Sequence, residues 1–185
     1  MLSMDLSLAA VLKDTWIILE SMVSRNSAQE NIITLATVDP ENQPQACSVV
    51  LRGIDTTHGL LEFYTDADSL KCKSISHNPN AQILIWKPEL AVQLRLYIEI
   101  RLTQGQMSKN RWKRVPVISQ TSYGKDPSTG TSIKMPHAYK TLSSEEKFVV
   151  ANCWIRRIDF LSLKEKHWRA QFNFDGEWDG QWIVP

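Results

Sequence analysis

The most constraining feature of the sequence is a strict two-residue alternation between Val92 and Leu102. Apolar side chains occupy every second position, and the positions between them carry Gln, Arg, Tyr, Glu and Arg. Successive side chains of a strand point to opposite faces of a sheet, so this pattern predicts a long strand with one face in a core. Other strands must pair with it and cover its apolar face. The sequence therefore predicts a β-rich fold.

Shorter β-rich runs and several helical segments surround this strand. The predicted strands span residues 32–38, 47–54, 60–65, 81–86, 154–163 and 166–174, with turn-forming clusters between several of them. Helices are predicted at about 6–24 and 66–77, and a short helical stretch at about 107–114. The capping-box spacing of Ser143-Ser144-Glu145-Glu146 predicts a further helix start. Many short antiparallel strands with few helices indicate a β-barrel or sandwich.

The size and charge of the chain restrict its organisation and its partners. Its 185 residues fit one domain, residues 1–185, with a long loop at about 119–141 and the C-terminal strands and tail at about 154–185. The 21 Lys and Arg residues against 20 Asp and Glu give a formal net charge of +1. Because phosphate neutralisation needs a basic excess or a basic stripe, no nucleic-acid partner is expected.

The cysteines and the apolar segments indicate in which cellular compartment the protein is expected. Cys47, Cys72 and Cys153 are odd in number and far apart, which argues against a disulfide framework and predicts no metal site. The N-terminus lacks the basic region of a signal peptide, and no apolar stretch approaches the length of a membrane span. We therefore expect a cytoplasmic protein that has no membrane partner.

The densest group of residues that could carry chemistry lies around the ends of the second and third predicted strands. Arg52 ends one strand, Thr65 ends the next, and Ser69 and Lys71 open the following helix. Cationic donors, hydroxyl groups and free helix amides are what a phosphate monoester requires. The glycines form no G-x-G-x-x-G or G-x-x-x-x-G-K motif, so the sequence predicts a phosphate site outside the Rossmann and P-loop classes.

The same segment resembles a known family. It contains, in order, the motifs Val49-Val50-Leu51-Arg52-Gly53, Phe63-Tyr64-Thr65-Asp66, Ser69-x-Lys71, Asn78-Pro79, Trp86 and Gln93-Leu94-Arg95. Their order and spacing are similar to those of pyridoxamine 5'-phosphate oxidases and their relatives. The residues of these motifs are most similar to those of the pyridoxamine-phosphate-oxidase-like branch of FMN-binding split barrels, whose substrates are largely unassigned.

The resemblance implies a mainly β fold with peripheral helices, a six-stranded antiparallel split β-barrel. It also implies a homodimer that binds FMN between its subunits and acts as an FMN-dependent oxidoreductase on a small molecule. The implied cofactor-binding residues are Ser48, Val49, Val50, Leu51, Arg52, Tyr64, Thr65, Ser69, Lys71, Gln93 and Trp178. Within this set Arg52, Thr65, Ser69 and Lys71 would hold the phosphate and Gln93 the isoalloxazine edge. Trp178 would reach the cofactor from the partner subunit.

The sequence departs from the family pattern at positions that touch ligands. Cys47 and Leu70 stand where the oxidases carry arginines, which predicts weaker FMN binding. Val115 replaces the arginine before Pro116, and Glu165 stands where the first arginine of the late R-x-H-D-R signature belongs, so vitamin B6 phosphate oxidation is less favoured. Ser119 is retained, and Arg114 is a neighbour that could substitute for the missing arginine.

The rest of that signature and several other functions remain open. His167 and Arg169 match it and are candidates for a proton donor and an anion clamp. Four alternatives compete with the oxidoreductase: a non-catalytic flavin-binding protein, a barrel that binds deazaflavin, one that binds haem, and a purely structural barrel.

Overall fold

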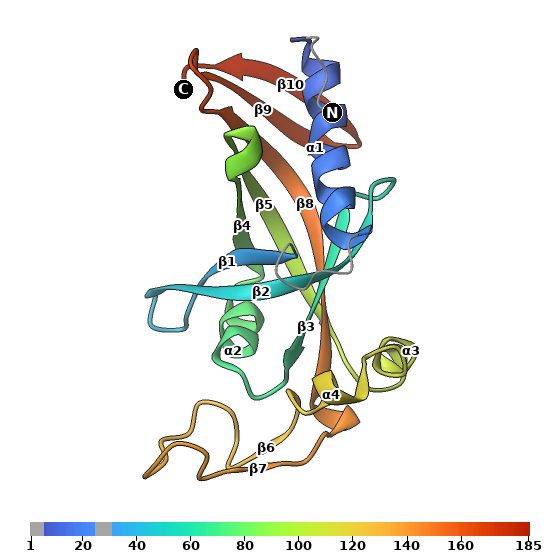
Figure 1. The fold of residues 1–185 in the computed structure, drawn as a ribbon, viewed down its shortest axis with the longest axis vertical. Helices are drawn as coiled ribbons and strands as arrows, with labels where there is room; N and C mark the ends of the chain where they lie inside the picture. The colour runs from blue at the N-terminus through green and yellow to red at the C-terminus, as the bar shows by residue number, and fades with distance from the viewer. Residues whose placement is uncertain (1–5, 25–30) are drawn as a thin grey trace.

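The chain folds around a closed antiparallel barrel (Figure 1). The computed structural model describes residues 6–24 and 31–185, and within these ranges six strands close the barrel. The barrel strands are β1 (Ile32–Val38), β2 (Pro44–Asp55), β3 (Leu60–Asp66), β4 (Asn80–Lys87), β5 (Val92–Thr103) and β8 (Phe148–Ser162). The pairing of β5 with β8 closes the ring, and β9 (Trp168–Asp175) and β10 (Glu177–Ile183) extend the sheet beyond β8. The predicted six-stranded antiparallel split barrel is confirmed.

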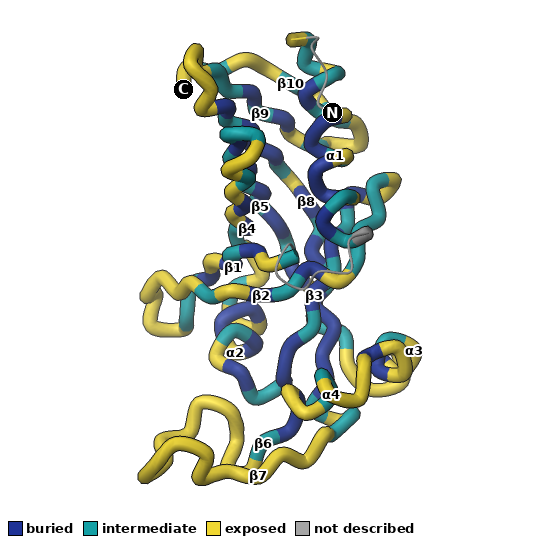
Figure 2. The backbone as a smooth tube through the Cα atoms, viewed as in Figure 1, coloured by how far each residue is buried: buried dark blue, intermediate teal, exposed yellow. Residues whose placement is uncertain are grey.

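The alternation seen in the sequence sets the two faces of β5. Leu94, Leu96 and their even-numbered neighbours are buried in the barrel core, and the odd-numbered residues face outward. Helix α1 (Leu8–Ser24) packs against β2, β9 and β10, and Figure 2 shows buried positions along this helix. Its Leu19 and Met22 belong to the same core. Helix α2 (Leu70–His77) contacts β1 and β5, and the turn η1 (Pro88–Leu90) joins β4 to β5. Both predicted helices are therefore confirmed.

A bulge in β8 changes which residues face the core. Ile98 pairs with Ile155 and Tyr97 pairs with Arg157, so one residue of β8, Arg156, has no opposite residue on β5. Below the bulge odd-numbered residues such as Cys153 point inward, and above it even-numbered residues point inward. Asp159 and Leu161 consequently lie on the outer face.

A second, aromatic core lies below the barrel. The ring of Phe148 is fully buried and contacts Tyr64, Trp112 and Tyr123 at centroid distances of 5.0, 5.3 and 5.0 Å. The segments that supply this cluster and the adjoining loop are η2 (Gly105–Met107), α3 (Lys109–Trp112), α4 (Val117–Gln120), β6 (Lys125–Asp126) and β7 (Lys140–Thr141). The predicted loop at 119–141 therefore contains the end of α4 and a two-stranded hairpin.

The C-terminal third differs from the prediction in three places. The expected helix at Ser143–Glu146 is a single 3-10 turn, η3 (Glu145–Lys147), because Phe148 already begins β8. Strand β8 starts well before residue 154, since residues 148–151 are all buried and show no two-residue alternation. The predicted tail after residue 174 forms strand β10, which pairs with β9 from Glu177 to Ile183.

Candidate functional site

The segment Ser48–Arg52 of β2 divides its side chains between the two faces of the barrel. Val49 and Leu51 are buried in the core, whereas Ser48, Val50 and Arg52 alternate with them on the outer face. Only the backbone of Val49 and Leu51 is therefore available to a ligand on the outside. The side chains of the other members of this segment face the solvent side of the sheet.

The junction between β3 and α2 brings together three of the four predicted phosphate ligands. Thr65 and Ser69 are buried, and their hydroxyl oxygens lie 3.1 Å apart. Lys71 is half-buried and follows two residues later in the first turn of α2. This donor set suits a phosphate monoester, which accepts hydrogen bonds from hydroxyl groups and from an ammonium.

The carboxylates next to this junction are already engaged. Asp66 accepts hydrogen bonds from the backbone N–H groups of Asp68 at 2.8 Å and of Gly124 at 2.6 Å. Asp68 forms an ion pair with Lys147 at 2.9 Å. Because these carboxylates already accept hydrogen bonds from other partners, they compete less with a bound phosphate for the donors of the junction.

Arg52 lies in a separate pocket rather than with the other predicted phosphate ligands. Its side chain is on the outer face, and Thr65 points into the barrel, so the two residues lie on opposite sides of the sheet. The pocket has a volume of about 390 Å3 and is lined by Arg52, Gly53, Glu62, Tyr64, Arg111, Arg114, Val115 and Pro116. The grouping of Arg52 with Thr65, Ser69 and Lys71 is therefore corrected.

This arginine pocket contains a fixed ion pair that sequence reasoning missed. Arg111 donates to Glu62 at 2.7 Å, and this hydrogen bond raises the pKa of Arg111. Burial raises the pKa of the Tyr64 hydroxyl, which also lines the pocket. Val115 is buried in the aromatic core and also lines the pocket, and the exposed Arg114 beside it adds a positive charge to the lining. The alternation of β3 predicts that Glu62 lies on the outer face. Its partner Arg111 could not be predicted, because it lies 49 residues away in the sequence.

Gln93 lies on the outer face at the other end of the barrel. Strand pairing places Gln93 opposite Leu161, and Leu161 opposite Arg169, so the three side chains form one row. At about 3.3 Å per residue, Gln93 lies about 30 Å along β5 from Leu102. Leu102 is the residue that pairs with Ala151, next to the end of β3. Within one chain Gln93 is therefore remote from the phosphate ligands.

Trp178 lies on the opposite face of the sheet from Gln93. Its ring packs edge-on against Trp16 of α1 at 5.7 Å and tilted against Phe174 at 5.1 Å. It also lies close to Gly59, where an added Cβ would approach the indole to 3.6 Å. The side chain thus helps to dock α1 onto β10, and the register does not bring it into the row of Gln93.

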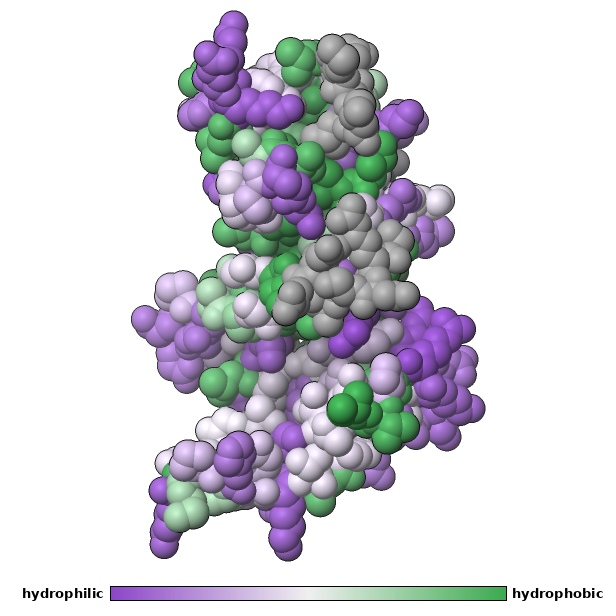
Figure 3. All heavy atoms as spheres, viewed as in Figure 1, coloured by the Kyte–Doolittle hydropathy of each residue, from purple (hydrophilic) through white to green (hydrophobic). Residues whose placement is uncertain are grey.

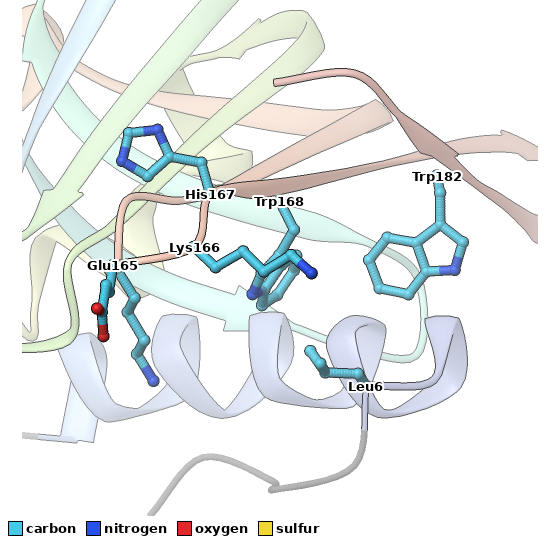
Figure 4. Close-up of a pocket in the computed structure, with 7 residues that line it drawn as sticks. Leu6, Glu165, Lys166, His167, Trp168 and Trp182 are labelled. Atoms are coloured by element: carbon cyan, nitrogen blue, oxygen red, sulfur yellow. The ribbon is translucent and has the colours of Figure 1, made fainter.

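The two candidate residues from the late motif, His167 and Arg169, lie in different surroundings. Arg169 on β9 forms two hydrogen bonds with Asp159, at 3.0 and 2.6 Å, and these raise the pKa of its guanidinium. His167 is exposed in the turn before β9 and lines a pocket of about 470 Å3 (Figure 4). Figure 4 shows His167 directed away from Trp168 and Trp182, which form the aromatic walls of that pocket. Arg169 is thus engaged with Asp159, whereas His167 lines a pocket outside β9.

Two other kinds of feature are absent from the described part of the chain. In residues 6–24 and 31–185, no group of three or more His, Cys, Asp or Glu side chains is arranged to hold a metal ion. Among the helices of the same described part of the chain, none is long and apolar enough to cross a membrane.

Comparison with known proteins identifies the family. Residues 13–104 match the family described as pyridoxamine 5'-phosphate oxidase, FMN-binding domain. The pyridoxine/pyridoxamine 5'-phosphate oxidase of Burkholderia thailandensis is 33% identical over 107 residues, which cover 58% of this chain and 48% of that protein. The enzyme of the same name from Microcystis aeruginosa is 34% identical over 92 residues, 50% of this chain and 42% of that protein. The chain thus spans about half the length of the curated relatives that it matches.

Solved structures share the fold across nearly the whole chain. A pyridoxamine 5'-phosphate oxidase-related, FMN-binding protein from Nostoc punctiforme has a TM-score of 0.75 and 22% identity, covering 97% of this chain and 100% of that one. PhzG from Burkholderia lata has a TM-score of 0.71 and 16% identity, covering 96% and 92%. These structures show the fold, and the family match and the curated relatives show that the chain belongs to the pyridoxamine 5'-phosphate oxidase-like family.

Proposed function

We propose that the protein is an FMN-binding flavoprotein that acts, as a homodimer, as an FMN-dependent oxidoreductase on a small anionic substrate. The observation that carries the proposal is the donor set of Thr65, Ser69 and Lys71, which lies inside the segment that matches the FMN-binding family. These residues would bind the phosphate of FMN. When bound, FMN would supply the acceptor for a hydride from the substrate.

The rest of the proposed FMN site follows from the faces of the strands. Ser48 and Val50 lie on the outer face of β2 beside the outward Tyr64 of β3, so their surface would support the flavin. Cys47 and Leu70 contribute no positive charge to this site. We therefore expect the phosphate to depend chiefly on Lys71 for charge neutralisation.

A homodimer would complete the site. Gln93 lies about 30 Å along β5 from the end of the barrel where the phosphate ligands lie, so we expect a second copy to supply the row of Gln93. The outer face around this row carries large exposed apolar side chains, Leu84 at 38% and Trp86 at 50%. Apolar side chains grouped on one face favour burial against a partner.

The arginine pocket is the proposed substrate site. It lies on the same outer face as Ser48 and Tyr64, and its lining combines three arginines with one carboxylate. Glu62 neutralises Arg111, so Arg52 and Arg114 remain for an anionic group such as a carboxylate or a phosphate. A non-catalytic flavin-binding protein is the second candidate, and the burial of Val115 favours it because the oxidases carry a substrate-binding arginine there.

A spectrum of the purified protein tests the flavin assignment. We expect a yellow protein whose two flavin absorption bands persist through gel filtration, and mass analysis of the extracted cofactor that identifies FMN. A Soret band, a deazaflavin mass or a colourless protein that ignores added FMN would refute the assignment. Anaerobic stopped-flow mixing with candidate amines, alcohols or NAD(P)H then separates the candidates, since only an oxidoreductase bleaches the bound flavin within catalytic times.

The variant Arg114→Ala tests the substrate pocket. We expect about tenfold weaker binding of small oxyanions, because one charge-assisted hydrogen bond is lost, and unchanged affinity for FMN. Binding is measured as the perturbation of the bound flavin spectrum by benzoate and, separately, by inorganic phosphate, which tells a carboxylate site from a phosphate site. Lys113→Ala is the matched control, since Lys113 is the exposed neighbour that does not line the pocket. An equal loss in both variants would show that the effect is only long-range charge.

A further inference from the structure

A pocket with aromatic walls lies on the face of the sheet opposite to Gln93. It has a volume of about 470 Å3, and we call it the tryptophan pocket after two of its lining residues, Trp168 and Trp182. Strand pairing puts Arg169 in the row of Gln93, so the preceding residue, Trp168, points to the other face. The sheet therefore separates the tryptophan pocket from the row of Gln93.

The two indole rings form a corner in this pocket. Trp168 is stacked on the buried ring of Phe160, with centroids 5.1 Å apart and planes inclined by 4°. Trp182 of β10 is 45% exposed and meets Trp168 edge-on, at 5.6 Å and 82°. Because aromatic rings favour stacked and edge-to-face contacts, such a corner can hold a further planar ring against both indoles.

Two exposed lysines, Lys164 and Lys166, give the lining of the pocket a positive charge. In the part of the chain that the structure describes, no ion pair or cation–π contact engages either ammonium. Figure 4 shows the Lys166 side chain extended toward Trp168, with its ammonium between the two indoles in that view, and Glu165 directed away from them. Figure 3 shows hydrophilic and hydrophobic side chains together at this end of the molecule. This combination favours a ligand that is both aromatic and anionic.

Two other partly exposed aromatic rings provide the contrast. Arg101 lies over Trp154 at 5.0 Å and also pairs with Glu99 at 3.3 Å. Arg157 lies over Tyr97 at 3.4 Å. These rings are covered by cations of the chain itself. In the tryptophan pocket, by contrast, the rings and the ammonium groups border the same space without contacts of this kind.

Trp168 is also a departure from the family pattern. It lies between His167 and Arg169, where the late R-x-H-D-R signature has an aspartate. A carboxylate at this position would face the same pocket and would repel an anion. The tryptophan instead adds aromatic surface at the place toward which Lys166 extends.

We propose that the tryptophan pocket binds a small planar aromatic carboxylate, separately from the flavin. The ring of this ligand would lie in the corner of the two indoles, and its carboxylate would accept a charge-assisted hydrogen bond from Lys166. The volume of the pocket is typical of a small-molecule site. The inference does not depend on the proposed function, because the tryptophan pocket shares no residue with the arginine pocket or with the phosphate junction.

Calorimetric titration of the full-length protein, as purified, with naphthoate tests the proposal. We expect saturable binding with a dissociation constant below about 1 mM, and shifts of the indole N–H NMR signals of Trp168 and Trp182. Lys166→Ala should weaken naphthoate binding about tenfold and leave the binding of the uncharged naphthamide within about twofold. Trp182→Ala should weaken the binding of both compounds about tenfold, since both lose the same ring contact.

Lys140→Ala is the matched control for Lys166→Ala. Lys140 is exposed on β7, in the hairpin beyond the aromatic core, and its replacement should leave naphthoate binding within about twofold of the wild type. Equal weakening by the two lysine variants would show a long-range charge effect and would overturn the proposal. Loss of naphthoate binding in Arg114→Ala would place the compound in the arginine pocket and would overturn it as well.

The remaining outcomes are equally decisive. A wild-type protein that binds no naphthoate, or a folded Trp182→Ala protein with unchanged affinity, would refute the site and leave the flavin assignment untouched. Indole signals that shift with protein concentration but not with naphthoate would show that a second copy of the chain covers the pocket, which also refutes it. If Trp182→Ala fails to fold, the exposed Lys166 decides alone through the contrast between naphthoate and naphthamide.

Discussion

Replacing Phe148 by alanine is expected to lower the free energy of unfolding by about 3–5 kcal/mol, the usual cost of deleting a buried aromatic ring. The side chain is fully buried and contacts three other aromatic rings, those of Tyr64, Trp112 and Tyr123. Its loss leaves a cavity that this small cluster cannot fill. Urea unfolding, followed by tryptophan fluorescence, measures the change because Trp112 belongs to the cluster.

An exposed apolar residue provides the control for Phe148. Ile118 of α4 is 82% exposed, so Ile118→Ala should change the unfolding free energy by less than about 0.5 kcal/mol. A comparable loss in the two variants would show that the aromatic cluster is not a core. Tyr64 and Val115 line both this cluster and the arginine pocket, so we also expect Phe148→Ala to weaken oxyanion binding.

Lys71→Ala is expected to weaken FMN binding by about 10–100-fold and to leave riboflavin binding unchanged. The reason is that a charge-assisted bond to a phosphate contributes about 1.5–3 kcal/mol and riboflavin has no phosphate. The effect should shrink with added salt, since a half-exposed cation is partly screened. Parallel titrations with the two flavins at low and high ionic strength measure it.

Lys73 lies on the same helix and serves as the control for Lys71. It is exposed and lines a different pocket, with Asp39 and Gln45, so Lys73→Ala should alter neither affinity by more than about twofold. Equal weakening of FMN and riboflavin by Lys71→Ala would contradict the phosphate role. It would indicate that the substitution disturbs α2 rather than a contact to the ligand.

The parts of the fold that the sequence predicted are those whose pattern is local. The alternation from Val92 to Leu102 specified both faces of β5, and the helical spacing from Leu8 specified α1. The start of β8 carries no such signal, because residues 148–151 are buried on both faces between β3, β5 and the aromatic cluster. The capping-box motif at Ser143–Glu146 predicted a helix, but the burial of Phe148 in β8 limits this segment to one 3-10 turn.

The candidate site divides in the same way. Thr65, Ser69 and Lys71 lie in one short segment, 65–71, so the sequence could predict that they are close together. The ion pair of Arg111 with Glu62 and that of Arg95 with Asp159 join residues 49 and 64 positions apart. Such pairs depend on strand order and register, which one sequence does not specify. For the same reason Arg52 could not be separated from the phosphate ligands before the faces of β2 and β3 were known.

Arg156, the bulge residue in the middle of β8, has no opposite residue on β5. This bulge determines which side chains face the core on either side of it. If Arg156 were instead paired regularly with β5, without the bulge, β8 would keep one inward–outward phase along its whole length. If Ala151 and Cys153 then kept their places in the interior, Asp159 would be forced inward and Phe160 out into water. The bulge at Arg156 thus lets one continuous strand keep both Cys153 and Phe160 in the interior while Asp159 stays on the outer surface.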